Sequence, residues 1–306
     1  MVKEMEVSEV KAGKSGLPAL AWAAMLLVSL LPDILFRELT GGLPGWLVWA
    51  KIGLMVALLL ASLMWSRIRA LSLFFVVLLA VNFFEFGVNR FYNALDYQSW
   101  LSGLSPFLQD TLAVQIQRLT TAALMMLIML VLLGSFKRFF FIKGKLDAEA
   151  APIPLILDKP SSWRILGPAI SGAMCLGLLV FIFVFGSLPS WQSLVNVIPL
   201  LPFVLLLAAS NAFGEEMIYR APWLAALEGP LGALQALLIT SVYFGVGHFY
   251  GVPYGVVGVV MAFIPGWLMG KAMLETRGFF WAWCIHLSMD LVIFFFMALG
   301  SVVPGG

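Results

Sequence analysis

Long, unbroken apolar runs are the feature that most constrains this chain. A bilayer-crossing helix needs about 20 mostly apolar residues, and the sequence predicts nine such spans, at 17–36, 46–66, 69–89, 114–134, 165–186, 194–214, 231–250, 252–270 and 279–299. Only helices or closed barrels satisfy their backbone groups in lipid. Because the apolar residues are continuous rather than alternating, we expect an all-α, polytopic membrane helical bundle of about eight to nine transmembrane helices.

Composition excludes other classes of protein. Hydrophobic residues make up 62% of the 306 residues and charged residues only 11%, whereas soluble domains carry about 25% charged residues. A net charge of +2 excludes a nucleic-acid partner. The two cysteines, Cys175 and Cys284, lie in apolar runs and exclude a disulfide scaffold. The lipid bilayer is therefore the expected surroundings of this chain.

The distribution of basic residues predicts an orientation, since Lys and Arg are retained on the cytoplasmic side. With the N-terminus in the cytoplasm, 14 of the 18 Lys and Arg residues fall inside. The other four, near outer ends, are Arg37, Lys51, Arg90 and Arg118. We expect a multi-pass protein with a cytoplasmic N-terminus, and an outer C-terminus if nine spans is the correct number. A re-entrant turn at 249–254 would leave fewer crossings.

Three sections follow from this pattern. Residues 1–136 form an N-terminal four-helix transmembrane section, and 137–163 form a cytoplasmic linker that begins basic and becomes proline-rich. Residues 164–306 form the C-terminal transmembrane core. In the front section Glu85 shares a helical stripe with Asn82 and Asn89, which predicts hydrogen bonds between helices.

Three motifs in the C-terminal section place ionisable groups inside apolar helices, where each is costly unless it is paired or functional. They are Asn211-Ala-Phe-Gly-Glu215-Glu216-Met-Ile-Tyr-Arg220, Phe244-Gly-Val-Gly-His248 and His286-Leu-Ser-Met-Asp290. Both histidines of the chain lie in these motifs. Two adjacent carboxylates, two imidazoles and an acidic partner in one section indicate a functional site.

Helical spacing predicts how these residues pair. Residues four apart share a helix face, so Glu216 and Arg220 can neutralise each other. Glu215 points roughly 100° away and has no such partner on its own helix. By the same spacing Asp290 can orient the ring of His286, and Phe244 can pack on the ring of His248. Gly245, Gly247 and Gly251 around His248 allow a neighbouring helix to approach closely.

The ordered triple Glu-Glu-x-x-x-Arg, Phe-x-x-x-His and His-x-x-x-Asp resembles the CAAX prenyl protease type 2 family, within the CPBP group (CAAX protease and bacteriocin-processing) of intramembrane proteases. The resemblance covers about residues 195–296. It implies an intramembrane endopeptidase in which Glu215 activates water and His248 orients that water. It also implies that His286 and Asp290 stabilise the oxyanion and that Glu216, Arg220 and Phe244 are supporting residues.

The chemistry of the residues agrees with that role. Peptide hydrolysis needs a base and hydrogen-bond donors for the oxyanion. The last motif position is Asn in many family members, but Asp290 cannot donate a hydrogen bond when ionised. Asp290 is therefore either protonated or orients His286.

Metal-free glutamate catalysis without a cofactor is preferred here. Two His and a Glu also resemble a zinc ligand set, and zinc is the alternative, although His-Glu-x-x-His is absent. The expected partner is a membrane-associated protein or peptide, such as a prenylated CAAX-type tail. Two other classes remain open: a proton-coupled transporter using the same groups as a relay, and a non-catalytic membrane scaffold or immunity factor.

Overall fold

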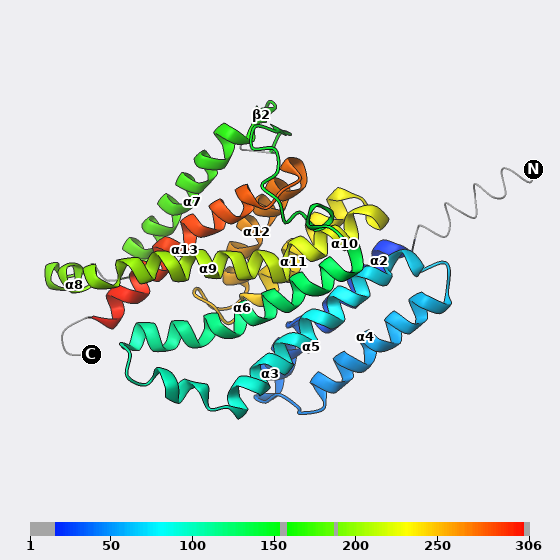
Figure 1. The fold of residues 1–306 in the computed structure, drawn as a ribbon, viewed down its shortest axis with the longest axis horizontal. Helices are drawn as coiled ribbons and strands as arrows, with labels where there is room; N and C mark the ends of the chain where they lie inside the picture. The colour runs from blue at the N-terminus through cyan, green and yellow to red at the C-terminus, as the bar shows by residue number, and fades with distance from the viewer. Residues whose placement is uncertain (1–15, 154–157, 187–188, 303–306) are drawn as a thin grey trace, which may run out of the picture. The chain divides into compact units, whose positions relative to one another are not determined.

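A computed structural model describes residues 16–153, 158–186 and 189–302, and these residues are almost entirely helical (Figure 1). The α-helices are α2 (Leu17–Val28), α3 (Leu31–Thr40), α4 (Leu47–Met64), α5 (Ser72–Ala94), α6 (Pro106–Leu133), α7 (Trp163–Phe185), α8 (Trp191–Asn196), α9 (Leu201–Tyr219), α10 (Ala221–Leu231), α11 (Ala233–Gly247), α12 (Val256–Thr276) and α13 (Phe280–Ser301). The short 3-10 turns are η1 (Arg69–Leu71), η2 (Tyr97–Leu101), η3 (Phe136–Phe139) and η4 (Ile198–Leu200). Within the described ranges, the strands are the antiparallel pair β1 (Glu149–Ala150) and β2 (Ser161–Ser162). The predicted all-α polytopic bundle is confirmed.

Seven helical stretches of the described chain are long and apolar enough to cross a bilayer. The number is eight if α2 and α3, bent by 47°, form one span. The predicted span 231–250 is the 15-residue helix α11, about 22 Å long against a hydrocarbon core of about 30 Å. It is separated from α10 by Gly232, which adopts a φ of 84°. The residues 1–15, which include the predicted cytoplasmic N-terminus, lie outside the described residues.

The chain divides into two compact units. Unit 1 contains the described residues of Met1–Phe83 together with Pro222–Gly270, and unit 2 contains those of Phe84–Ala221 with Lys271–Gly306. Helices α5 and α12 each contribute residues to both units. The predicted sections 1–136, 137–163 and 164–306 are divisions of the sequence, which this spatial grouping does not test.

Unit 1 holds α11 against α2 and α12. The indole of Trp22 on α2 donates to Gln235 on α11 at 2.9 Å. A β-carbon on Gly245 would stand 2.8 Å from the carbonyl oxygen of Val259 on α12. The predicted close approach is therefore confirmed at Gly245, because only a residue without a side chain fits there. It is wrong at Gly247, where a β-carbon would meet nothing within 4 Å, and at Gly251, where it would meet only the backbone of His248.

Unit 2 is built around α9. Helices α6 and α13 pack on α9, and α7 packs on α13. An apolar cluster ties α9 to its neighbours and consists of Phe107, Leu108, Val197, Val204, Leu207, Ala208, Phe294, Ala298 and Leu299. The arrangement puts the C-terminal half of α9, with its acidic motif, between α6 and α13.

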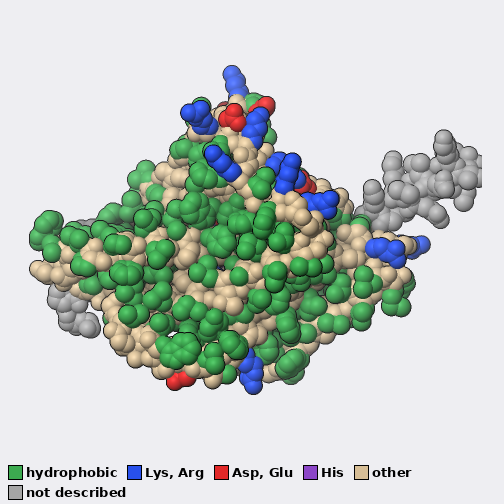
Figure 2. Space-filling view, in the orientation of Figure 1, with side chains coloured by type: hydrophobic (Ala, Val, Ile, Leu, Met, Phe, Trp, Pro, Cys, Tyr) green, Lys and Arg blue, Asp and Glu red, His purple; other side chains and the backbone are tan. Residues whose placement is uncertain are grey.

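The basic connections of unit 2 meet at one end. The N–H of Lys145 donates to the carbonyl of Thr276 at 2.8 Å, and the N–H of Phe279 donates to that of Ile142 at 2.8 Å. The 134–162 connection and the turn between α12 and α13 therefore lie together. In Figure 2, Lys and Arg side chains gather at the top, where Figure 1 places β2 and the start of α7.

Candidate active site

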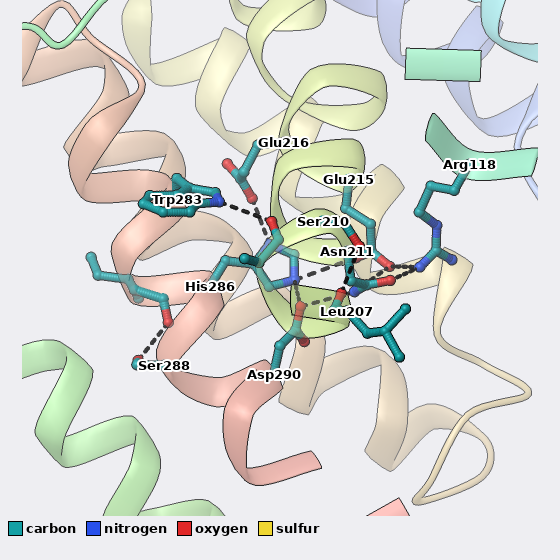
Figure 3. A network of polar contacts seen from close by, with 12 residues as sticks. Arg118, Leu207, Ser210, Asn211, Glu215, Glu216, Trp283, His286, Ser288 and Asp290 are labelled. Atoms are coloured by element: carbon teal, nitrogen blue, oxygen red, sulfur yellow. Dashed lines mark hydrogen bonds and ion pairs between the residues drawn. The ribbon is translucent and has the colours of Figure 1, made fainter. Parts of the chain in front are cut away.

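Helices α9 and α13 bring together four of the predicted site residues (Figure 3). The Nδ1–H of His286 donates to Glu216 Oε1 at 2.8 Å. On the other side of the ring, Nε2 lies 3.5 Å from Glu215 Oε2 and 3.7 Å from Asp290 Oδ2. The two adjacent carboxylates of α9 thus flank one imidazole, which the spacing along the sequence alone did not reveal.

The position of His286 requires a proton on the side facing Glu215 and Asp290. Once Nδ1–H is donated to Glu216, a neutral ring presents a lone pair at Nε2. A lone pair opposite two carboxylates is repulsive in a poorly solvated interior. The arrangement is attractive only if Nε2 or one of these carboxyl groups carries a proton. His286 and the two carboxylates facing its Nε2 therefore share at least one proton.

Glu216 and Arg220 form the predicted i,i+4 ion pair, and both side chains are completely buried. The guanidinium compensates the charge of Glu216 while that carboxylate accepts the hydrogen bond from His286. The supporting role predicted for Glu216 and Arg220 is consistent with this geometry, since the pair fixes the orientation of the His286 ring.

Asn211 is a central residue that sequence reasoning did not single out. Its Nδ2 donates to Asp290 Oδ2 at 2.9 Å and to Glu215 Oε1 at 3.3 Å. Its Oδ1 accepts from Gln115 Nε2 at 2.7 Å and from the guanidinium of Arg118. The sequence could have indicated this contact, because Asn211 lies one helical turn before Glu215 and therefore shares its helix face.

Arg118 corrects one of the predictions. It was counted among basic residues near an outer helix end, on the expectation of a span over 114–134. Helix α6 instead begins at Pro106, so Arg118 lies about 18 Å along it. Its Nη1 is 2.8 Å from Glu215 Oε1. This guanidinium is the counter-charge that Glu215 lacks on its own helix.

The prediction that Asn82, Glu85 and Asn89 form hydrogen bonds between helices holds in part. The hydroxyl of Tyr219 donates to Glu85, and Asn89 Nδ2 donates to Gln117 Oε1 at 3.2 Å, so both residues link helices as expected. Asn82 instead donates to the carbonyl of Leu78 within α5 at 2.9 Å.

His248 lies in unit 1, directly after α11. Its ring packs on Phe244 with centroids 4.5 Å apart, as predicted. Its Nδ1–H donates to the carbonyl of Phe244 at 2.8 Å, which assigns the proton to Nδ1 in the neutral ring and leaves Nε2 as an acceptor. The role of His248 beside Glu215 stays a prediction.

A polar chamber of about 650 Å³ adjoins the cluster within unit 2. Its polar lining comes from α5, η2, α6 and the end of α9, and consists of Glu85, Asn89, Asn93, Tyr97, Gln98, Gln109, Asp110, Gln117, Arg118, Thr121 and Tyr219. The lining residues of α6 lie between Gln109 and Thr121, and the helix continues to Leu133, next to the basic connections. Arg118 lines this chamber and also contacts Glu215.

The His, Cys, Asp and Glu side chains of the described residues do not form an evident metal centre. Among the described residues, no group of three or more His, Cys, Asp and Glu side chains is arranged to hold a metal ion. His286 directs Nδ1–H at Glu216, and Asn211 and Arg118 already bind Glu215. The side chains of unit 2 bind one another instead of surrounding a common point.

Comparison with known proteins agrees with the motif analysis. Residues 197–292 match the model of a family described as type II CAAX prenyl endopeptidase Rce1-like. No curated protein and no solved structure matches the chain. The match confirms the predicted resemblance, and it indicates protease activity on a membrane-associated protein by an integral, multi-pass membrane protein. The matched segment contains α9, α11 and most of α13, whereas Arg118 and most of the chamber lie outside it.

We predict that Arg220→Met lowers the free energy of unfolding by about 3–5 kcal/mol, because it leaves Glu216 buried without its counter-charge. Thermal or denaturant unfolding of the protein in detergent measures this. The double variant Glu216→Gln/Arg220→Met removes both charges and is expected to recover much of the loss. Equal stability of Arg220→Met and the unaltered protein would show that the pair is not a supporting element.

Proposed function

We propose that this chain is an intramembrane endopeptidase in which Glu215 activates water for attack on a peptide bond. The observation that carries the proposal is the convergence of Glu215, His286 and Asp290 in the buried interior of unit 2. A carboxylate base, an imidazole and amide donors within a few ångströms are the groups that peptide hydrolysis requires.

In the proposed reaction, Glu215 removes a proton from water while the water oxygen attacks the scissile carbonyl carbon. The resulting oxyanion accepts hydrogen bonds from N–H donors of the site, for which His286 Nε2–H is well placed. Collapse of the tetrahedral intermediate breaks the C–N bond, and the proton held by Glu215 passes to the leaving amine. His248, with Nε2 as an acceptor, would orient the water.

Asp290 acts as an orienting carboxylate in this scheme. It accepts a hydrogen bond from Asn211 and lies beside His286, which supports the orienting alternative over a protonated donor. Asn211 donates both of its amide N–H groups to carboxylates, one to Asp290 and one to Glu215, so it holds these two side chains in place.

The substrate we propose is a membrane-associated protein or peptide with an apolar segment, such as a prenylated CAAX-type tail. An apolar groove of about 380 Å³ runs along α7, α9 and α13. Ser288, Leu291 and Val292 of α13 line it, and they flank Asp290 along the same helix. An apolar chain held there would lie close to the polar cluster.

We further propose that the N-terminus is cytoplasmic. The 134–162 connection and the α12–α13 turn share one end of unit 2, and both carry basic residues that the orientation rule retains inside. The chamber lies against the first part of α6, and α6 ends at Leu133, next to the 134–162 connection. With that connection in the cytoplasm, the chamber lies nearer to the outer side.

Glu215→Gln is expected to reduce cleavage about 10²–10⁴-fold, because the amide cannot accept the proton from water. The assay uses a quenched-fluorescence peptide ending in a farnesylated CAAX tail, and its unprenylated counterpart, with the purified protein in vesicles. Glu149→Gln, on the exposed strand β1, is the matched control and should cleave normally. Proton-driven uptake by vesicles without cleavage would favour a transporter, and unchanged function in Glu215→Gln would favour a non-catalytic scaffold.

Removal of metal ions is expected to leave cleavage unchanged, because Glu215 performs the activation of water in this proposal. The rate is measured after dialysis against 1,10-phenanthroline and again after zinc is added back. A loss on chelation that zinc restores would instead establish the zinc alternative.

The proposed orientation predicts opposite labelling of two variants that each carry one added cysteine. Gln98→Cys, at an exposed residue that lines the chamber, should react with a membrane-impermeant maleimide in intact cells. Lys145→Cys, in the basic connection, should react only after permeabilisation. The reverse pattern would overturn the orientation; the unaltered protein, with half-buried Cys175 and Cys284, gives the background.

A further inference from the structure

Arg118 is the residue of unit 2 whose position the proposed function leaves unexplained. Its Nη1 donates to Asn211 Oδ1 and lies 2.8 Å from Glu215 Oε1. One guanidinium group therefore contacts both the proposed base and the amide that links this base to Asp290. A quarter of the side-chain surface of Arg118 is exposed.

A glycine on α9, Gly214, leaves room for the side chain of Arg118 beside Glu215. A β-carbon on Gly214 of α9 would come within 2.9 Å of Arg118 Cγ and 3.2 Å of its Cδ. The aliphatic part of Arg118 thus packs against Gly214, the glycine of the acidic motif. Gly214 directly precedes Glu215, so the packing that seats this aliphatic part also aims the guanidinium at that carboxylate.

The energetic reason follows from burial. A carboxylate in a water-poor interior needs an opposite charge or several hydrogen-bond donors. Glu216 has Arg220 on its own helix, whereas the cation nearest to Glu215 comes from α6. A hydrogen bond from a charged donor also fixes direction, so Arg118 determines where the oxygens of Glu215 point.

We propose that Arg118 is a positioning residue for Glu215, and that the polar chamber gives small polar molecules access to Arg118. This inference rests on the proposed protease function and adds a residue that lies outside the matched segment 197–292. Because Arg118 lines the chamber, a small cation entering through it can reach the place that a shortened side chain leaves empty.

The test is chemical rescue of Arg118→Ala by guanidinium. The variant should lose about 10- to 100-fold in kcat, the size of one charge-assisted hydrogen bond, with little change in KM. Millimolar guanidinium chloride should restore at least about tenfold of that loss. Arg118→Lys, which keeps the charge, should retain more activity than Arg118→Ala.

A second measurement does not depend on cleavage. Guanidinium that binds in the vacated place stabilises the folded variant, because a ligand bound only by the native state raises Tm. We expect millimolar guanidinium to raise the Tm of Arg118→Ala and not that of the unaltered protein. This readout tests the chamber even if the peptide substrates of the cleavage assay are not cut, which would be a failure of the proposed function.

Three matched variants separate positioning from general damage. Gly214→Ala should reduce kcat by displacing Arg118, but guanidinium should not rescue it, because the arginine still occupies the space. Arg220→Ala should resist rescue, since Arg220 is completely buried. Arg90→Ala, exposed at the end of α5, should cleave normally.

Several outcomes would overturn the inference. Unreduced cleavage by Arg118→Ala would show that Glu215 needs no positioning by this residue. A loss that guanidinium leaves unchanged, together with an unchanged Tm, would show that Arg118 is a structural residue without access from the chamber. An effect confined to KM would assign it to substrate binding instead.

Discussion

The neutralisation of carboxylates buried among apolar helices is the interaction on which the site of unit 2 depends. Glu215, Glu216 and Asp290 are three potential negative charges within a few ångströms of His286. An unpaired charge in such surroundings would cost far more than a folded protein can tolerate. Arg118 pairs with Glu215 and Arg220 pairs with Glu216, and His286 adds to the compensation when it is protonated. Because each of the two adjacent acids of α9 has its own arginine, the two can differ in role.

The division of roles between Glu215 and Glu216 follows from the geometry of a helix. Neighbouring residues on a helix point about 100° apart, so the two carboxylates face different partners. Glu216 meets Arg220 and the Nδ1 side of His286 in a fully buried pair. Glu215 meets α6 and the Nε2 side of the same ring. Glu216 is held by Arg220 and His286, while Glu215 faces Arg118, which lines the polar chamber.

Two cavities of opposite character flank α9. The chamber beside Arg118 is lined largely by amides, hydroxyls and carboxylates, whereas the groove along α7 and α13 is lined by apolar side chains. Hydrolysis in a membrane has to bring water to an apolar or lipid-modified chain, although water and apolar groups do not mix. Two separate cavities, one lined by the C-terminal end of α9 and the other by its N-terminal part, offer a physical solution.

The sequence by itself determined the helical membrane class, because unbroken apolar runs of this length permit little else, and it located the acidic and histidine motifs through the cost of ionisable groups in lipid. Spacing also sufficed for Glu216 with Arg220 and for Phe244 with His248, since i,i+4 pairing is local. Only the tertiary structure decided that Arg118 compensates Glu215 and that Asn211 joins it to Asp290. Those contacts join helices 70 or more residues apart in the sequence. The choice of neighbouring helices and their relative height depends on the packing of whole helix surfaces and not on any local pattern.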